Sequence, residues 1–227
     1  MTDVAIDEKL ARKVLELVDH GLVKGLGKPK AGQMCVEAAV NFAMGREHGD
    51  DPNCVSPALR RLKIRINDKA WSSNEARAKG LRRLAVAQLG SAGVLDEKEF
   101  VKRCAELAIG VYVPKALRSA AGMKGNAKHK LALMAAALDC ENEPTRDNAL
   151  KAKTAATAAT AATAAAAATA AADAAYAAAD AAYAAADAAA KSKARDKVLA
   201  EFCEDVVQIL IAMKAPGCQW LFLTEAA

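Results

Sequence analysis

The loop GREHGDDPNCVSP (residues 45–57) collects side chains that could bind a metal ion. It contains His48, Asp50, Asp51 and Cys54, and Cys35 lies a short distance upstream. Zinc binds imidazole nitrogen, thiolate sulfur and carboxylate oxygen, so Cys35, His48 and Cys54 with one carboxylate are candidate ligands of a metal-dependent enzyme. The spacing matches no established zinc pattern. The alternative is that the aspartates form turns and Cys54 is buried.

A second candidate site is a run of basic residues that follows this loop. Only Asp68 and Glu75 oppose it locally, and such a cluster could neutralise nucleic-acid phosphates. The candidate nucleic-acid-binding residues are Arg60, Arg61, Lys63, Arg65, Arg77, Arg82 and Arg83. Interleaved leucines and Ile66 also fit ordinary amphipathic helices with an arginine-rich outer face, and the cluster has neither a set of interleaved aromatic residues nor a named motif.

Nucleophilic catalysis has no support in the sequence. The chain has three histidines, and it lacks both a G-x-S-x-G motif and a strand followed by a glycine-rich phosphate loop. We therefore expect no catalytic residue and no cofactor.

A third candidate site lies in the second half of the alanine-rich segment 154–190, where polar residues from Thr169 to Lys191 recur at spacings of three and four. At about 100° per residue they fall on one arc of about 80°. The candidate partner-binding residues on this stripe are Asp173, Tyr176, Asp180, Tyr183 and Asp187. The stripe could dock on the basic face of the chain itself, or it could remain open to a basic partner.

The elements that position these residues are helices. DEKLARKVLELVDHG places Leu10, Val14, Leu17 and Val18 on one face. Further helix starts are expected at Ser56–Pro57, at Ser72 with Glu75, at Asp96, at Pro114, at Asn126 and at Thr145. No run of alternating β-branched residues predicts a strand.

The alanine-rich segment itself is predicted to be a packed central helix. Alanine is the strongest helix former, which argues against disorder. Asp173, Asp180 and Asp187 argue against a membrane span, and the threonines do not share the flat face of an ice-binding rod. One helix over 145–214 would span about 105 Å, so a break is expected at Lys191–Lys197. Asp196 would cap the last helix, and Ala170–Ala190 would pack against Val198–Ile211.

Composition limits the remaining possibilities. The 227 residues have a formal net charge of +5, which permits nucleic acid as a partner without requiring it. Six cysteines are scattered without a C-x-x-C pair, and the first residues, MTDVAIDEKLARK, lack an apolar leader. We expect reduced thiols, a cytoplasmic location and no membrane association.

Two stretches carry a resemblance. The segment MCVEAAVNFAMGREHGDDPNCVSPALRRLKIRIND, with H-x-D-x-P-x-C-V-x-P, and the alanine–tyrosine–aspartate repeat followed by FCEDVVQILIAMKAPGCQWL resemble uncharacterised bacterial and phage proteins. Some members with alanine–tyrosine repeats are labelled immunity proteins. The resemblance implies a helical fold and names no catalytic residues. This chain departs from the pattern where threonine replaces the aromatic residues.

We therefore expect an all-α single domain of eight or nine helices, residues 1–227, around a long alanine-rich helix paired with the C-terminal helix. Its sub-regions would be 1–143 and 144–227. The first function hypothesis is a non-catalytic protein-binding protein with an unknown protein partner, immunity- or antitoxin-like. The second is a nucleic-acid-associated protein, and the third is the metal-dependent enzyme.

Overall fold

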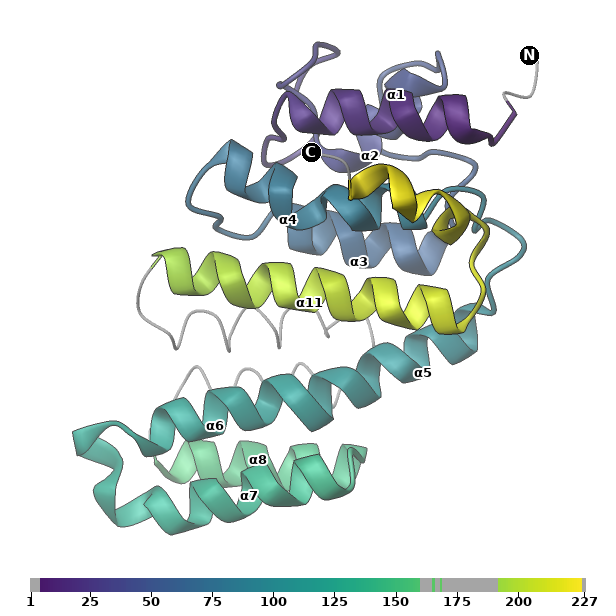
Figure 1. Cartoon of the computed structure of the whole chain (residues 1–227). Helices are drawn as coiled ribbons and strands as arrows, with labels where there is room; N and C mark the ends of the chain where they lie inside the picture. The colour runs from purple at the N-terminus through teal and green to yellow at the C-terminus, as the bar shows by residue number, and fades with distance from the viewer. Residues whose placement is uncertain (1–4, 160–164, 166–167, 169–191, 226–227) are drawn as a thin grey trace. The chain divides into compact units, whose positions relative to one another are not determined.

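The computed structural model is all-α, as the sequence predicts, and describes residues 5–159, 165, 168 and 192–225 (Figure 1). No strand occurs among these residues; Gly27 and Met34 form an isolated antiparallel bridge. The chain divides into two compact units. Unit 1 comprises Met1–Phe100 and Ala200–Ala227, and unit 2 comprises Val101–Leu199. These boundaries differ from the expected sub-regions because the C-terminal residues return to the first unit.

Unit 1 contains six helical elements and the start of a seventh that continues into unit 2. They are α1 (Glu8–Asp19), α2 (Val36–Ala43), α3 (Pro57–Asn67), α4 (Asn74–Ala87), the C-terminal part of α11 (Ser192–Ala212), the 3-10 helix η4 (Pro216–Thr224), and the beginning of α5 (Glu97–Leu107). Helix α1 packs on α2, α4 and η4, and α2 also packs on α3 and α4 (Figure 1). The predicted face of α1 is confirmed, since Leu10, Val14, Leu17 and Val18 are buried.

Unit 2 is built around three helices. The π-helix η1 (Ala108–Tyr112) leads into α6 (Val113–Ala121), which is followed by the 3-10 helix η2 (Lys124–His129), α7 (Lys130–Asn142) and α8 (Arg146–Ala158). Helix α7 packs against both α6 and α8 (Figure 1). Alanine dominates these contacts: Ala116, Ala120, Ala137, Ala149 and Ala152 are buried, which allows close approach of the helices.

Several predicted helix starts are confirmed. Thr145 caps α8 by accepting a hydrogen bond from the Asn148 N–H, and the Asp96 carboxylate accepts from the Lys98 and Glu99 N–H groups at the start of α5. Ser56 is the N-cap of α3 with Pro57 in the first turn, but its hydroxyl makes no capping bond. It donates instead to Glu97 Oε1 at 2.7 Å.

Other boundaries differ from the prediction. The cap of α4 is Ser73, not Ser72, because the Ser73 hydroxyl is the one that accepts from the Ala76 N–H. Pro114 lies in the first turn of α6, as predicted, but α6 does not start from a loop. The missing N–H of Pro114 removes one helical hydrogen bond, and the chain runs from α5 through the π turn η1 into α6.

Two further boundaries were wrong. Asn126 does not cap α7; it lies inside η2, where its side chain donates to the Ala120 carbonyl. Asp196 does not cap the last helix, since α11 already begins at Ser192. Helix α8 ends at Ala158, before the expected break. The expected pairing of Ala170–Ala190 with the C-terminal helix lies outside the described residues.

Candidate functional site

A fully buried ion pair joins α2 to α3 in unit 1. Lys63 Nζ lies 3.3 Å from Glu37 Oε1, and both side chains have zero exposure. Glu37 follows the capping residue Cys35 on a helix that is buried along most of its length, and Lys63 lies on the same side of α3 as the buried Leu59, Leu62 and Ile66. The helical repeat therefore directs both charged groups into the core.

Burial works against the charge on both members of this pair. It raises the pKa of Glu37, against the opposing effect of the nearby Lys63 ammonium. It lowers the pKa of Lys63, against the opposing effect of the Glu37 carboxylate. Among the described residues, neither Glu37 oxygen nor Lys63 Nζ has a hydrogen-bond partner, because the 3.3 Å contact lacks hydrogen-bond geometry. A lysine with a lowered pKa suits nucleophilic chemistry, but full burial closes this one to a substrate.

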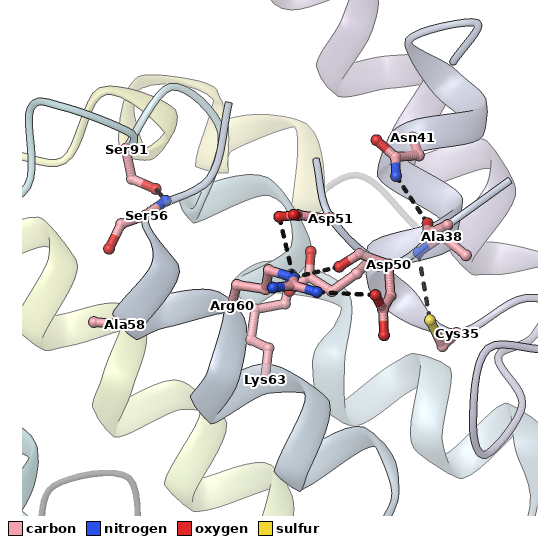
Figure 2. A network of polar contacts seen from close by, with 12 residues as sticks. Cys35, Ala38, Asn41, Asp50, Asp51, Ser56, Ala58, Arg60, Lys63 and Ser91 are labelled. Carbon is pink, nitrogen blue, oxygen red and sulfur yellow. Dashed lines mark hydrogen bonds and ion pairs between the residues drawn. The ribbon is translucent and has the colours of Figure 1, made fainter. Parts of the chain in front are cut away.

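One helical turn before Lys63, Arg60 binds the loop that joins α2 to α3 (Figure 2). Its guanidinium donates to the Asp50 carbonyl and to Asp50 Oδ1, the latter at 2.9 Å, and its Nε lies 3.4 Å from Asp51 Oδ1. The Asn41 side chain donates to the Gly49 carbonyl at 2.8 Å. Farther along, the Ser56 N–H donates to the Ser91 hydroxyl at 2.9 Å. The two aspartates thus bind an arginine of the next helix.

The three weak metal-ligand candidates each have another contact. Cys35 caps α2, with its sulfur accepting from the Ala38 N–H at 3.4 Å (Figure 2). Cys54 lies beside the Met44 sulfur at 3.6 Å, and His48 Nε2 lies 3.1 Å from the Gly27 carbonyl oxygen. Among the described residues, no group of three or more His, Cys, Asp or Glu side chains is placed to hold a metal ion. The structure does not bring these candidates together as a ligand set.

The basic residues predicted to bind nucleic acid are engaged within the protein. The guanidinium of Arg77 is buried and donates to the Asn67 and Leu22 carbonyls at 2.8 and 3.0 Å. Arg82 pairs with Asp19 at 2.7 Å, and Arg83 pairs with Glu204 at 2.9 Å. With Arg60 and Lys63 described above, and with further interactions made by Arg61 and Arg65, the cluster serves intramolecular contacts.

The polar–aromatic stripe lies outside the described residues. This applies to Asp173, Tyr176, Asp180, Tyr183 and Asp187, so the choice between internal docking and an open binding face stays a prediction.

In unit 2, α7 carries two apolar faces. Leu133, Ala136, Ala137 and Cys140 are buried on the side that packs against α6 and α8. On the opposite side, Leu131 is 86% exposed and Leu138 is 50% exposed. By the helical repeat, these leucines share an arc of about 100° with Met134 and Ala135. We call Leu131, Met134, Ala135 and Leu138 the outward face of α7. Large exposed apolar side chains gathered on one face are typical of an interaction site.

Neither the buried pair nor the outward face was recognised from the sequence, although both leave a signal. Glu37 interrupts the apolar run MCVEAAVNFA, which indicates a charge that needs a buried partner. The α7 sequence LALMAAAL is apolar all round, so its periodicity does not mark one core-facing side.

Comparisons with known proteins add no assignment. No family model matches the chain, and neither the curated proteins nor the solved structures gave a match. Within the described part of the chain, no helix combines the length and the apolar character needed to cross a lipid bilayer.

Proposed function

We propose that this chain is a non-catalytic protein-binding protein and that the outward face of α7 is its binding surface. Two exposed leucines on the same face of α7 support the proposal. Leu131 is 86% exposed, and Leu138, about two helical turns later, is 50% exposed. Burying an exposed leucine gains roughly 1.5–3 kcal/mol, so a partner that covers both would gain substantially.

The narrower proposal, an immunity- or antitoxin-like role, is supported by the sequence resemblance alone. In that form the partner is a different protein, a toxin.

The test is a capture experiment with the tagged full-length chain in an extract of the native host that also contains an untagged copy of the chain. The variant L131Q/L138Q removes the apolar side chains and should leave the fold intact, because both leucines are exposed. Leu150→Gln is the matched control, since Leu150 lies on α8 and is 38% exposed.

We expect wild type and L150Q to retain a specific protein that L131Q/L138Q loses. Circular dichroism and melting temperature should be the same for all three. Equal retention by all three proteins, or retention of nothing, would contradict the proposal.

A further inference from the structure

The connection between α1 and α2, residues 20–35, carries three lysines and no acidic residue. Lys24, Lys28 and Lys30 are all exposed. Within the described part of the chain, no hydrogen bond or ion pair involves their ammonium groups. We call residues 24–33 the lysine loop. It differs from the arginines of α3 and α4, which are engaged within the protein, because its positive charges are left available to a ligand.

Hydrogen bonds fix the tip of the lysine loop. The Lys28 N–H donates to the Gln33 carbonyl at 2.7 Å and closes the tip. The Lys30 N–H donates to the Lys28 carbonyl, also at 2.7 Å, across Pro29, whose ring fixes its own φ angle. Lys28 and Lys30 therefore flank one tight turn, with Cα atoms at most about 7 Å apart.

Two glycines allow the loop to close. Gly27 has a φ of 74° and Gly32 a φ of 75°, in the left-handed region that favours glycine. A Cβ on Gly27 would lie 2.0 Å from the Gln33 carbonyl oxygen, and one on Gly32 would lie 2.8 Å from the His20 carbonyl oxygen. The loop thus folds against itself and against the end of α1. Such a preorganised loop loses less conformational freedom when its lysines bind a ligand.

Two carboxylates that lie close to the loop already have partners. Asp68 accepts hydrogen bonds from the Gly25 N–H at 2.8 Å and from the Asn67 side chain at 2.9 Å. Asp50 lines the same small cavity as Gly25 and is bound by Arg60 at 2.9 Å. Their negative charges are therefore used in holding the backbone and α3, and they do not pair with the lysines.

We propose that the lysine loop binds the phosphate backbone of nucleic acid without reading its sequence. Duplex DNA carries one negative charge per about 1.7 Å of its axis, so a compact group of three lysines meets several phosphates at once. Lysine binds phosphate as a point charge, and phosphate contacts position a protein without specifying a base.

A membrane surface matches the loop less well. Attachment to anionic lipid typically uses about four to eight basic residues, or fewer basic residues together with an apolar anchor. The lysine loop, which the structure describes throughout, has three lysines, and its one large exposed apolar side chain is Leu26 at 41%. The density of charge therefore favours nucleic acid.

This inference is independent of the proposed function. The lysine loop belongs to unit 1, whereas the outward face of α7 belongs to unit 2. The variant L131Q/L138Q should therefore bind nucleic acid as wild type does, and each proposal can fail without the other.

The first experiment measures fluorescence anisotropy of the full-length protein with a short random-sequence DNA duplex, its single strand and the corresponding RNA, at about 20 mM salt. Wild type should bind at least one of these probes. K24Q/K28Q/K30Q should bind it at least about tenfold more weakly, with an unchanged circular dichroism spectrum. Failure of wild type to bind any of the three probes would overturn the proposal.

The matched control is K9Q/K98Q/K214Q, which causes the same change in net charge. These three lysines lie outside the loop, are exposed and, like the loop lysines, have no side-chain partner among the described residues. The control should bind within about twofold of wild type. Equal losses in the two triple variants would show that overall charge, and not the loop, drives binding.

The second experiment measures how affinity for the DNA duplex depends on salt. Each phosphate contact contributes about −0.9 to the slope of log K against log salt concentration, so K24Q/K28Q/K30Q should have a slope shallower by up to about 2.7. K24R/K28R/K30R keeps the charges and should retain both affinity and slope. An unchanged slope in the glutamine variant, or lost binding in the arginine variant, would contradict phosphate binding by these lysines.

The third experiment is co-sedimentation with phosphatidylcholine vesicles that contain phosphatidylserine. Wild type should bind these vesicles more weakly than it binds nucleic acid at the same salt concentration. If wild type binds the vesicles but not the nucleic acids, and K24Q/K28Q/K30Q loses that binding, the loop recognises anionic lipid and the proposal is wrong.

Discussion

Lys63 Nζ lies 3.3 Å from Glu37 Oε1 in the fully buried interface between α2 and α3. Each group makes the other tolerable in an apolar environment, because an isolated buried charge is far more costly than a paired one. The pair is therefore a strong determinant of how α2 docks on α3, and it is open to direct measurement.

Removing one member of the pair should cost much more than removing both. Glu37→Leu leaves a buried ammonium and Lys63→Met leaves a buried carboxylate, so each should lower the free energy of unfolding by about 3–5 kcal/mol. The double variant leaves no unpaired charge and should lie within about 2 kcal/mol of wild type. Urea unfolding of wild type, the two single variants and the double variant at neutral pH gives the complete double-mutant cycle. Simple additivity of the two single costs would show that the pair is not coupled.

The two single variants should depend on pH in opposite directions. In Lys63→Met, burial raises the folded-state pKa of Glu37, so stability is greatest below the unfolded pKa and falls as pH rises through the folded value. In Glu37→Leu, burial lowers the folded-state pKa of Lys63, so stability is greatest above the unfolded pKa and falls as pH decreases. Chemical unfolding between about pH 5 and about pH 10, relative to wild type, measures both slopes, each limited to about 1.4 kcal/mol per pH unit. If the stability of both single variants changed with pH in the same direction, the assignment of the two slopes to Glu37 and Lys63 would be wrong.

Arg60 should control the order of the loop between α2 and α3. Arg60→Ala removes its bonds to Asp50 and Asp51, and the loop amides from Gly49 to Cys54 should exchange hydrogen faster. The stability loss should be about 1–2 kcal/mol, because the contact is only partly buried. Hydrogen exchange with mass spectrometry measures the loop directly. Arg12→Ala removes an exposed pair with Glu8 and is the control; loop protection equal in both variants would contradict the assignment.

The six thiols should react in a defined order. Five cysteines are buried and Cys218 is partly exposed. Burial raises the pKa of Cys104 and Cys203 to about 12 and that of Cys140 and Cys218 to about 11, so few of these groups are thiolate at pH 8 and exposure sets the order of reaction. Timed alkylation followed by peptide mass spectrometry should label Cys218 first and the other five only on unfolding. A native disulfide, or rapid labelling of all six, would oppose the prediction.

Local chemistry was enough to place most of the helices. Thr145 acts on the first residues of α8, and the apolar residues of α1 repeat within that one helix, so both signals can be read from nearby residues alone. The predicted N-cap of α4 was off by one residue, because two neighbouring serines, Ser72 and Ser73, could both cap the helix and Ser73 does so. It also missed the π turn before Pro114, since the proline signals a missing hydrogen bond but not how the backbone absorbs the loss.

The sequence by itself determined an all-α chain with helix faces that can be read from periodicity. The tertiary structure decided which charges found partners. Arg60, Lys63 and Arg77 look like one basic cluster along the chain, yet they bind a loop, a buried carboxylate and backbone carbonyls. It also decided which of the two apolar faces of α7 stays uncovered. Periodicity describes one helix alone, whereas burial and pairing depend on segments distant in sequence that only folding brings into contact.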